Sequence, residues 1–325
     1  MLHTQEELLH IINKTITKEQ FDYKPVELFE PIKYTLSLGG KHIRPLMLLM
    51  ACEMFGGDIN DGIYPAFGLE VFHNFTLIHD DILDNASLRR GKATVYKKWD
   101  LNRAILSGDT MFALSYDYFF RTKEEFIVPI LKVFNKTAVE VCRGQQYDMN
   151  YETEKDVSIA AYIEMIRLKT AVLLGAAVKI GAIIGGAKEQ DSIHIYNFAE
   201  NLGIAFQLKD DILDLYSQQE VFGKETGGDI VSRKKTYLFL KACELADNEL
   251  REQLVPLYLE TSLEPQTKIK CVRAIFDKLK IKKVTEEEID KYYKTALYHL
   301  DKITINKEDK ASFYQFAKQL MKRDK

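Results

Sequence analysis

The chain has 325 residues, of which 46% are hydrophobic and 29% charged, so it can build a core and is not intrinsically disordered. Its net charge of −3 at pH 7 excludes the strongly basic balance of a general nucleic-acid-binding protein. Four widely spaced cysteines without a CxxC pair exclude a disulfide framework and a cysteine zinc site, and predict a reduced, cytoplasmic protein.

Helical periodicity dominates the sequence, and no run of alternating strand residues is convincing. Prolines mostly stand where helices could begin or end, and no Ser/Gly linker divides the chain. We therefore predict one all-α domain over residues 1–325. The predicted helices cover residues 4–15, 24–38, 43–55, 63–84, 101–121, 124–149, 158–185, 190–216, 233–246, 248–260, 266–279, 285–302 and 308–322, with loops at 56–62, 85–93, 152–156 and 217–233.

Several of these helices are apolar on more than one side, which is typical of helices buried at the centre of a bundle. They are the ones near 63–84, 101–121, 158–185 and 190–216. The most apolar stretch, 171–186, is interrupted by Lys179 and is short for a bilayer span, so we expect no transmembrane segment. The N-terminus lacks the basic start and continuous apolar run of a signal peptide.

The sequence DDILD occurs twice, at 80–84 and again at 210–214, each time at the end of an apolar-rich helix. On a helix the first and last aspartates of each copy share one face. Two carboxylates about 4 Å apart repel by about 4 kcal/mol at an effective dielectric of 20, so a cation is expected nearby. All-oxygen ligands with room for water and phosphate favour Mg²⁺. One copy alone would more simply be a solvated acidic helix end, but two identical copies predict metal ions that hold a polyanion.

Four clusters of basic residues could bind a polyanion. They are GGKHIRP at 39–45, Arg89-Arg90-Gly91-Lys92, Lys169-Thr170 inside an apolar helix, and the glycine-rich GKETGGD at 223–229 followed by KKT. Glycines allow tight turns, helix starts offer free N–H groups, and arginine fits phosphate oxygens in a bidentate fork. Each cluster alone could equally be a set of solvated charges, and His73 alone is more often a histidine at the rim of a core.

Taken in order, GGKHIRP, His73 with DDILD, LRRG, LKT, QLKDD, GKETGGD and KKTY resemble the trans-isoprenyl diphosphate synthases of the polyprenyl synthetase family. The matches cover residues 39–237, and the basic end of the chain is similar to the family's tail. The resemblance implies an all-α isoprenoid synthase fold around a central cavity and a homodimer. It implies Mg²⁺-dependent, head-to-tail condensation of isopentenyl diphosphate with an allylic diphosphate (dimethylallyl, geranyl or farnesyl), with three Mg²⁺ per active site.

The resemblance also implies roles for individual residues, because each motif has a counterpart in the family. The implied metal ligands are Asp80, Asp81, Asp84, Asp210, Asp211 and Asp214. The residues implied to bind the allylic diphosphate are Arg89, Lys169, Lys224 and Lys234. Those implied to bind isopentenyl diphosphate are Lys41, Arg44, His73 and Arg90. Thr170 and Gln207 match positions near the developing cation, so the implied catalytic set is Asp80, Asp81, Asp84, Lys169, Thr170, Gln207 and Asp210.

Product length should depend on the residues one or two turns before the first DDILD, where a growing prenyl tail would run. Phe75 and Thr76 lie five and four positions before Asp80, and Phe72 lies a turn deeper. An aromatic side chain there would limit the cavity to short products, and the pattern resembles farnesyl and geranylgeranyl synthases. We favour a C20 product, with C15 next, although both phenylalanines could be ordinary core residues.

Three other functions are compatible with parts of the pattern. A class I terpene cyclase also ionises an allylic diphosphate, but it needs no second diphosphate site such as GGKHIRP with His73. A catalytically silent subunit of a heteromeric synthase would be expected to lose an acidic motif, and both are whole here. A metal-dependent phosphohydrolase is suggested only by the His79-Asp80 pair, without further histidines at metal-ligand spacing.

Overall fold

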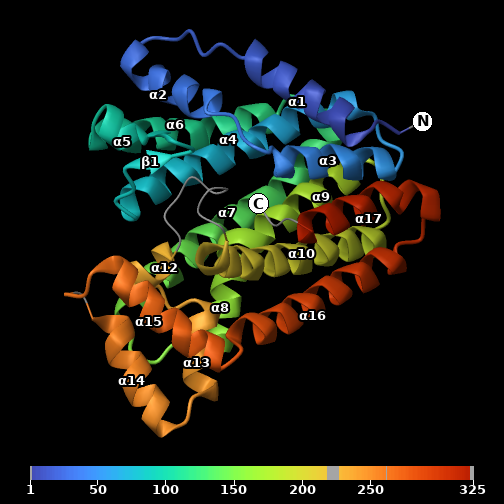
Figure 1. Ribbon diagram of the computed structural model, residues 1–325. Helices are drawn as coiled ribbons and strands as arrows, with labels where there is room; N and C mark the ends of the chain where they lie inside the picture. Colours follow the sequence, from blue (N-terminus) through green and yellow to red (C-terminus); the bar gives the residue numbers. More distant parts are fainter. Residues whose placement is uncertain (1, 218–226, 261, 323–325) are drawn as a thin grey trace. The chain divides into compact units, whose positions relative to one another are not determined.

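We describe the fold from a computed structural model, which describes residues 2–217, 227–260 and 262–322 (Figure 1). Almost every element in these ranges is a helix. The elements are α1 (Gln5–Lys18), α2 (Val26–Ser37), α3 (Ile43–Met54), α4 (Ile59–Leu83), β1 (Leu88–Arg89), β2 (Lys92–Ala93), α5 (Val95–Lys98), α6 (Leu101–Phe119), α7 (Glu124–Thr153), α8 (Ile159–Ile166), the π-helix η1 (Arg167–Ala171), α9 (Val172–Ile184), α10 (Glu189–Tyr216), α12 (Gly228–Val231), α13 (Tyr237–Leu245), α14 (Asn248–Leu259), α15 (Pro265–Lys278), α16 (Ile281–Lys302) and α17 (Lys307–Met321).

The chain forms two compact units, each with its own core. The first comprises the chain up to Lys136 together with Ala176–Tyr196 and Ile303–Phe313. The second comprises Thr137–Gly175, Asn197–Lys302 and the chain from Tyr314 onward. The single domain that we expect over 1–325 therefore stays a prediction.

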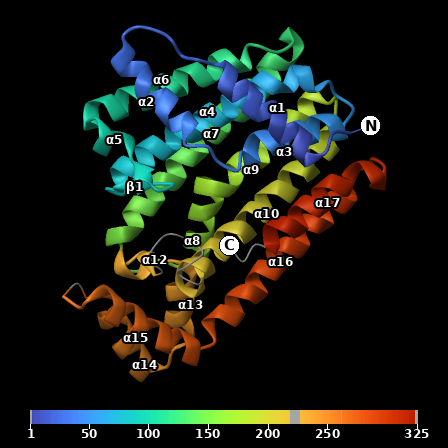
Figure 2. The same ribbon diagram turned by 45° about the horizontal axis from the view of Figure 1, so that its top comes forward.

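The first unit is built on α4, which packs against α3 and α6 and has buried residues on all sides (Figures 1 and 2). α4 begins at Ile59, four residues before the predicted start, because the side chain of Asp58 caps the helix by accepting a hydrogen bond from the Asn60 amide. Pro65 then falls inside the helix and cannot donate to the Asp61 carbonyl. The hydroxyl of Thr122 donates to that carbonyl at 2.8 Å, so the helix continues without an unsatisfied group.

The core of the second unit gathers side chains from α8, α10 and α13 to α16, among them Phe239, Tyr258 and Phe276. Figures 1 and 2 both show α13, α14 and α15 packed together. α15 begins at Pro265, where the Glu264 side chain caps the two following free amides. This core supports the end of α10 that carries the second DDILD.

The all-α prediction is confirmed, but several predicted boundaries differ from the structure. Besides the early start of α4, α12 lies within the loop predicted at 217–233, and α13 begins at Tyr237 instead of at 233. The helix predicted over 158–185 is interrupted by the π-helix at 167–171. The loop predicted at 85–93 contains a hairpin, because strands of two residues are too short to show alternation. α16 starts at Ile281, four residues before the predicted 285.

Candidate active site

The first DDILD occupies the last turn of α4. Asp80 and Asp81 lie within the helix and Asp84 is its C-cap. Asp81 is 4% exposed, and burial raises its pKa although the guanidinium of Arg89 acts in the opposite direction. Arg89 donates from Nε to Asp81 Oδ1 at 2.8 Å, and its Nη2 lies 3.5 Å from Asp80 Oδ2. Carboxylates at the C-terminal end of a helix face the negative pole of its dipole, which makes a cation favourable there.

The Arg-Arg-Gly-Lys motif forms the β1–β2 hairpin, in which Arg89 pairs with Lys92. The two turn residues, Arg90 and Gly91, have φ angles of 52° and 74°, as a type I′ turn requires. The turn separates the two arginines. Arg89 faces the aspartates of α4, whereas the guanidinium of Arg90 lies over the backbone of Gly40.

The GGKHIRP segment meets α4 at a cluster of basic side chains in the same unit. Arg44 Nη1 lies 3.0 Å from His73 Nε2, and burial lowers the pKa of His73 well below its ordinary value. A Cβ atom on Gly40 would lie 3.0 Å from Arg90 Nη2, so glycine lets that guanidinium approach the loop. Lys41 is exposed just before α3. The structure thus brings Arg44, His73 and Arg90 to one place.

The predicted chain-length residues belong to an aromatic cluster of the first unit. Phe72 is fully buried, whereas Phe75 is half-buried and stacks on Phe112 of α6 with a centroid distance of 5.3 Å. Thr76 is also half-buried, and its hydroxyl donates to the His73 carbonyl. Of the two phenylalanines, Phe75 is the one with surface left to meet a ligand.

Lys169 and Thr170 lie in the π-helix η1, a device often found at functional sites. A Cβ atom on Gly144 of α7 would lie 2.7 Å from Lys169 Cα and closer still to its nitrogen, so the two backbones are in direct contact here. Lys169 Nζ donates to Asp148 Oδ2 of α7 at 2.7 Å, and Thr170 Oγ1 donates to Gln207 Oε1 at 3.1 Å.

The second DDILD lies in the last two turns of α10. Tyr162 donates from its hydroxyl to Asp211 Oδ2 at 2.5 Å, and Gln207 donates to the other oxygen of Asp211 at 3.4 Å. Burial raises the pKa of Asp211 to about 7, and burial together with the Asp229 carboxylate does the same for Asp210. Asp214 Oδ2 accepts a hydrogen bond from the Asp229 amide at 3.1 Å, so it also holds the chain that follows α10.

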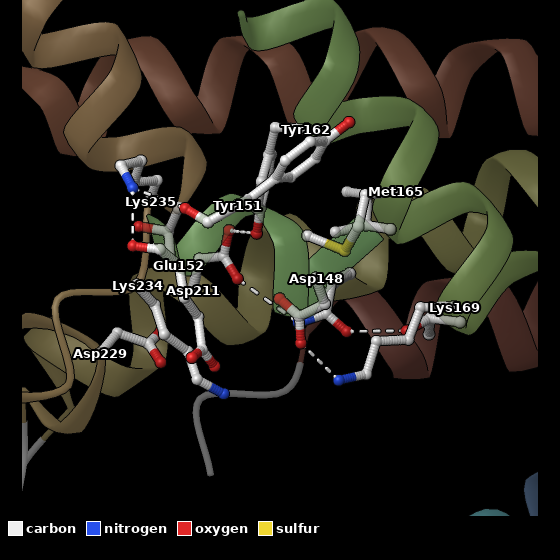
Figure 3. A pocket seen from close by; sticks show the side chains of 14 residues that line it. Asp148, Tyr151, Glu152, Tyr162, Met165, Lys169, Asp211, Asp229, Lys234 and Lys235 are labelled. Atoms are coloured by element: carbon white, nitrogen blue, oxygen red, sulfur yellow. Dashed lines mark hydrogen bonds and ion pairs between the residues drawn. The ribbon is translucent and has the colours of Figure 1, made fainter. Parts of the chain in front are cut away.

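These groups surround a cavity of about 110 Å³ in the second unit. Figure 3 shows Lys169 and Asp148 pointing toward one another on one side, and Asp229 and Lys234 together on the other. The lining also includes Tyr162, Gln207 and Asp211, with Met165 as an apolar neighbour. The Asp229 pKa is raised to about 7 by burial and by the Asp214 and Asp211 carboxylates, and a cation bound beside these carboxylates would favour their ionised forms.

The polyprenyl synthetase profile matches residues 25–275 of the chain. The chain belongs to the polyprenyl synthetase family. Its sequence is 39% identical to a geranylgeranyl diphosphate synthase of Methanosarcina mazei over 68% of this chain and 69% of that protein. It is 33% identical to a geranylgeranyl diphosphate synthase of Sulfolobus acidocaldarius over 92% of this chain and 91% of that protein. A crystal structure of a geranylgeranyl pyrophosphate synthase superposes with a TM-score of 0.94, at 42% identity and 99% coverage of both chains.

Membership of the polyprenyl synthetase family confirms the predicted resemblance and makes the protein a prenyltransferase. Lys224 lies outside the described residues. No helix within 2–217, 227–260 and 262–322 has the length and apolar character needed to cross a bilayer.

Magnesium binding depends on whether the carboxylates suit the ion. In the part of the chain that the structure describes, no three His, Cys, Asp or Glu side chains form a ready-made metal cage. Magnesium usually takes only one or two carboxylates and completes its shell with water and substrate phosphates. Oxygen-only donors with pKa values raised by burial therefore fit an ion that arrives with a diphosphate.

Three polar residues near these sites were missed from sequence. Asp148 binds Lys169, Tyr162 binds Asp211, and Glu70 of α4 binds His42. Glu70 had a usable signal, since it is a lone carboxylate in the apolar stretch that leads to His73. Tyr162 had none, because a tyrosine that binds a site aspartate cannot be distinguished in a sequence from an ordinary core tyrosine.

Proposed function

We propose that the protein condenses isopentenyl diphosphate head-to-tail with an allylic diphosphate to give a short all-trans prenyl diphosphate. The observation that carries this proposal is the convergence of Arg44, His73 and Arg90 on one place, while Arg89 contacts the aspartates of the first DDILD. A family member that joins two diphosphates needs one such metal-free site besides the metal-dependent one. A terpene cyclase has no use for it.

On the donor side, we assign six aspartates to Mg²⁺, with three ions per active site. They are Asp80, Asp81, Asp84, Asp210, Asp211 and Asp214. When bound, the ions would neutralise the charge that grows on the departing diphosphate. Arg89 and Lys169 are held in reach by Asp81 and Asp148, and each would exchange its carboxylate for a phosphate oxygen. Lys234, which lines the cavity, and Lys224 complete the proposed allylic site.

The residues of η1 and α10 suit the cationic stage of the reaction. Thr170 Oγ1 and Gln207 Oε1 lie 3.1 Å apart and present oxygen dipoles where positive charge would develop on the allylic carbon. The double bond of isopentenyl diphosphate then attacks that carbon, and the proton released leaves with the departing diphosphate. The diphosphate of isopentenyl diphosphate would be held by Lys41, Arg44, His73 and Arg90, so that the acceptor binds without metal ions and is not itself ionised.

We propose a C20 product, with C15 as the next candidate. Relatives named geranylgeranyl diphosphate synthase support this length. The half-buried Phe75 with Phe112 behind it supports a floor that stops elongation, and Thr76 beside it leaves room for a short tail. Fully buried Phe72 would limit only a longer product.

We further propose a homodimer and a cytoplasmic location. Large apolar side chains are exposed on α6, including Leu101 and Leu106, and on α7, including Val128 and Val139. A second copy of the chain would remove these surfaces from water. Light scattering in solution should give twice the mass of the chain.

A direct assay tests the proposed reaction. The protein is incubated with Mg²⁺, isopentenyl diphosphate and dimethylallyl, geranyl or farnesyl diphosphate, and the dephosphorylated products are sized by chromatography. We expect C20 chains from all three primers. Cyclic products without consumption of isopentenyl diphosphate would indicate a terpene cyclase. No turnover except with an added second protein would indicate a silent subunit.

A further inference from the structure

We propose that Glu70 is a positioning residue for the isopentenyl diphosphate site, in that its buried carboxylate fixes the loop and the cations that grip the diphosphate. This inference rests on the function proposed above and deepens it. Glu70 lies on α4, one turn before His73, and is 2% exposed. It is too deeply buried to touch a substrate, so any effect on binding must pass through its neighbours.

The carboxylate of Glu70 is bound from two directions. Its Oε1 lies 3.0 Å from His42 Nδ1 and accepts a hydrogen bond from Asn74 Nδ2 at 3.2 Å. A buried charge is tolerated only where it is paired and hydrogen-bonded. Burial acts to raise the pKa of Glu70, but the His42 hydrogen bond and the nearby His73 and Arg44 outweigh it and hold the pKa at about 2. Glu70 is therefore a permanent anion.

That anion lies beneath a set of cations that would otherwise repel one another. The pKa of Arg44 is lowered to about 10, chiefly by burial and also by the charge of Arg90, and Glu70 acts against both. The same carboxylate opposes the effect of burial on Arg90. Two guanidinium groups and a histidine can thus be kept in one place before the diphosphate arrives, because one negative charge already lies behind them.

Glu70 also fixes the backbone that presents these groups. His42 directly precedes α3 and has a φ of 44°, a left-handed conformation that is unfavourable for a residue with a side chain. Its ring is buried and bound to Glu70, so this contact helps to hold the strained residue in place. Lys41 and Arg44 flank His42, and their positions follow from its conformation.

A variant that keeps the shape but removes the charge tests this role. In Glu70→Gln, we expect the KM for isopentenyl diphosphate to rise roughly 10- to 100-fold, the range for loss of a charged hydrogen bond. The KM for the allylic substrate should stay within about twofold, because the allylic site has its own cations. Glu70→Asp should recover part of the loss. Binding of isopentenyl diphosphate alone, measured by calorimetry in EDTA, should weaken by the same factor.

A matched control is Glu53→Gln, which removes a carboxylate of the same unit whose partner is His3. It should leave both KM values unchanged. If Glu70→Gln does not fold, His42→Ala removes the other half of the pair and should show the same selective rise.

An unchanged KM for isopentenyl diphosphate would overturn the proposal, and so would equal losses for both substrates accompanied by a lower Tm. Failure of the proposed function is distinguishable, because the wild-type protein would then turn over no primer at all.

Discussion

Replacing Gly144 with alanine should damage the allylic site through the backbone of η1. The added Cβ would lie 2.3 Å from the Lys169 backbone nitrogen, whereas ordinary contacts begin near 3.4 Å. α7 and η1 must therefore separate by about 1.1 Å, since neither backbone can rotate away from the contact. That shift acts on Lys169, whose Nζ is held 2.7 Å from Asp148 on the same α7.

Two opposing free energies decide the stability of Gly144→Ala. Overpacking costs about 1–3 kcal/mol, and the helix preference of alanine over glycine returns up to about 1 kcal/mol. We expect a net loss of at most about 3 kcal/mol, and hence a Tm lower by less than about 10 °C. Activity should suffer more, with kcat/KM for the allylic substrate falling roughly 10- to 100-fold, as misplacements of this size do elsewhere.

The assay measures kcat/KM for farnesyl diphosphate at saturating isopentenyl diphosphate, with Tm by calorimetry. Gln146→Ala is the matched control, because Gln146 is an exposed residue of the same helix. A Gly144→Ala protein with wild-type kcat/KM and wild-type Tm would refute the close contact between α7 and η1.

Three further predictions follow from the described contacts. Phe75→Ala should lengthen the products, because it opens the space in front of Phe112, and an unchanged product distribution would remove Phe75 from that role. Asp80→Asn should lower turnover at least 100-fold, and Asp84→Asn less, with little change in Tm; wild-type rates for both in saturating Mg²⁺ would contradict the metal assignment. Burial raises the pKa of Asp211 to about 7, so the folded state holds a proton that the unfolded state has lost, and in EDTA the free energy of unfolding should fall by about 1 kcal/mol from pH 6 to pH 8. Asp211→Asn should remove that part of the slope, and an identical slope in calorimetry would refute the shifted pKa.

Local chemistry made the first half of the site predictable. The spacing of each DDILD places its carboxylates on one helix face, and the structure shows both motifs at helix ends. Arg44 and His73 lie 29 residues apart, yet they meet as the family resemblance implied. Residue type, spacing and motif order were sufficient for these features.

What could not be predicted depends on contacts between distant helices. The π-helix at Lys169 lies against Gly144 of α7, and no local preference of the segment signals that contact. Asp148 and Tyr162 matter because of what they touch, which a single sequence does not encode in its spacing. The early start of α4 depends on the Asp58 cap and on Thr122, 61 residues from the carbonyl it binds.

The ion pairs Arg89–Asp81 and Lys169–Asp148 mean that two of the proposed diphosphate-binding cations already have a carboxylate partner before any substrate arrives. A free inorganic anion that bound Arg89 or Lys169 would displace Asp81 or Asp148 and leave that carboxylate without a cation. A metal-bound diphosphate would bring metal ions for the carboxylates and phosphate oxygens for the two basic side chains at the same time. When the substrate binds, the carboxylates would exchange their basic partners for metal ions, and the basic side chains would exchange their carboxylates for phosphate oxygens. This exchange favours binding of the complete metal–diphosphate complex.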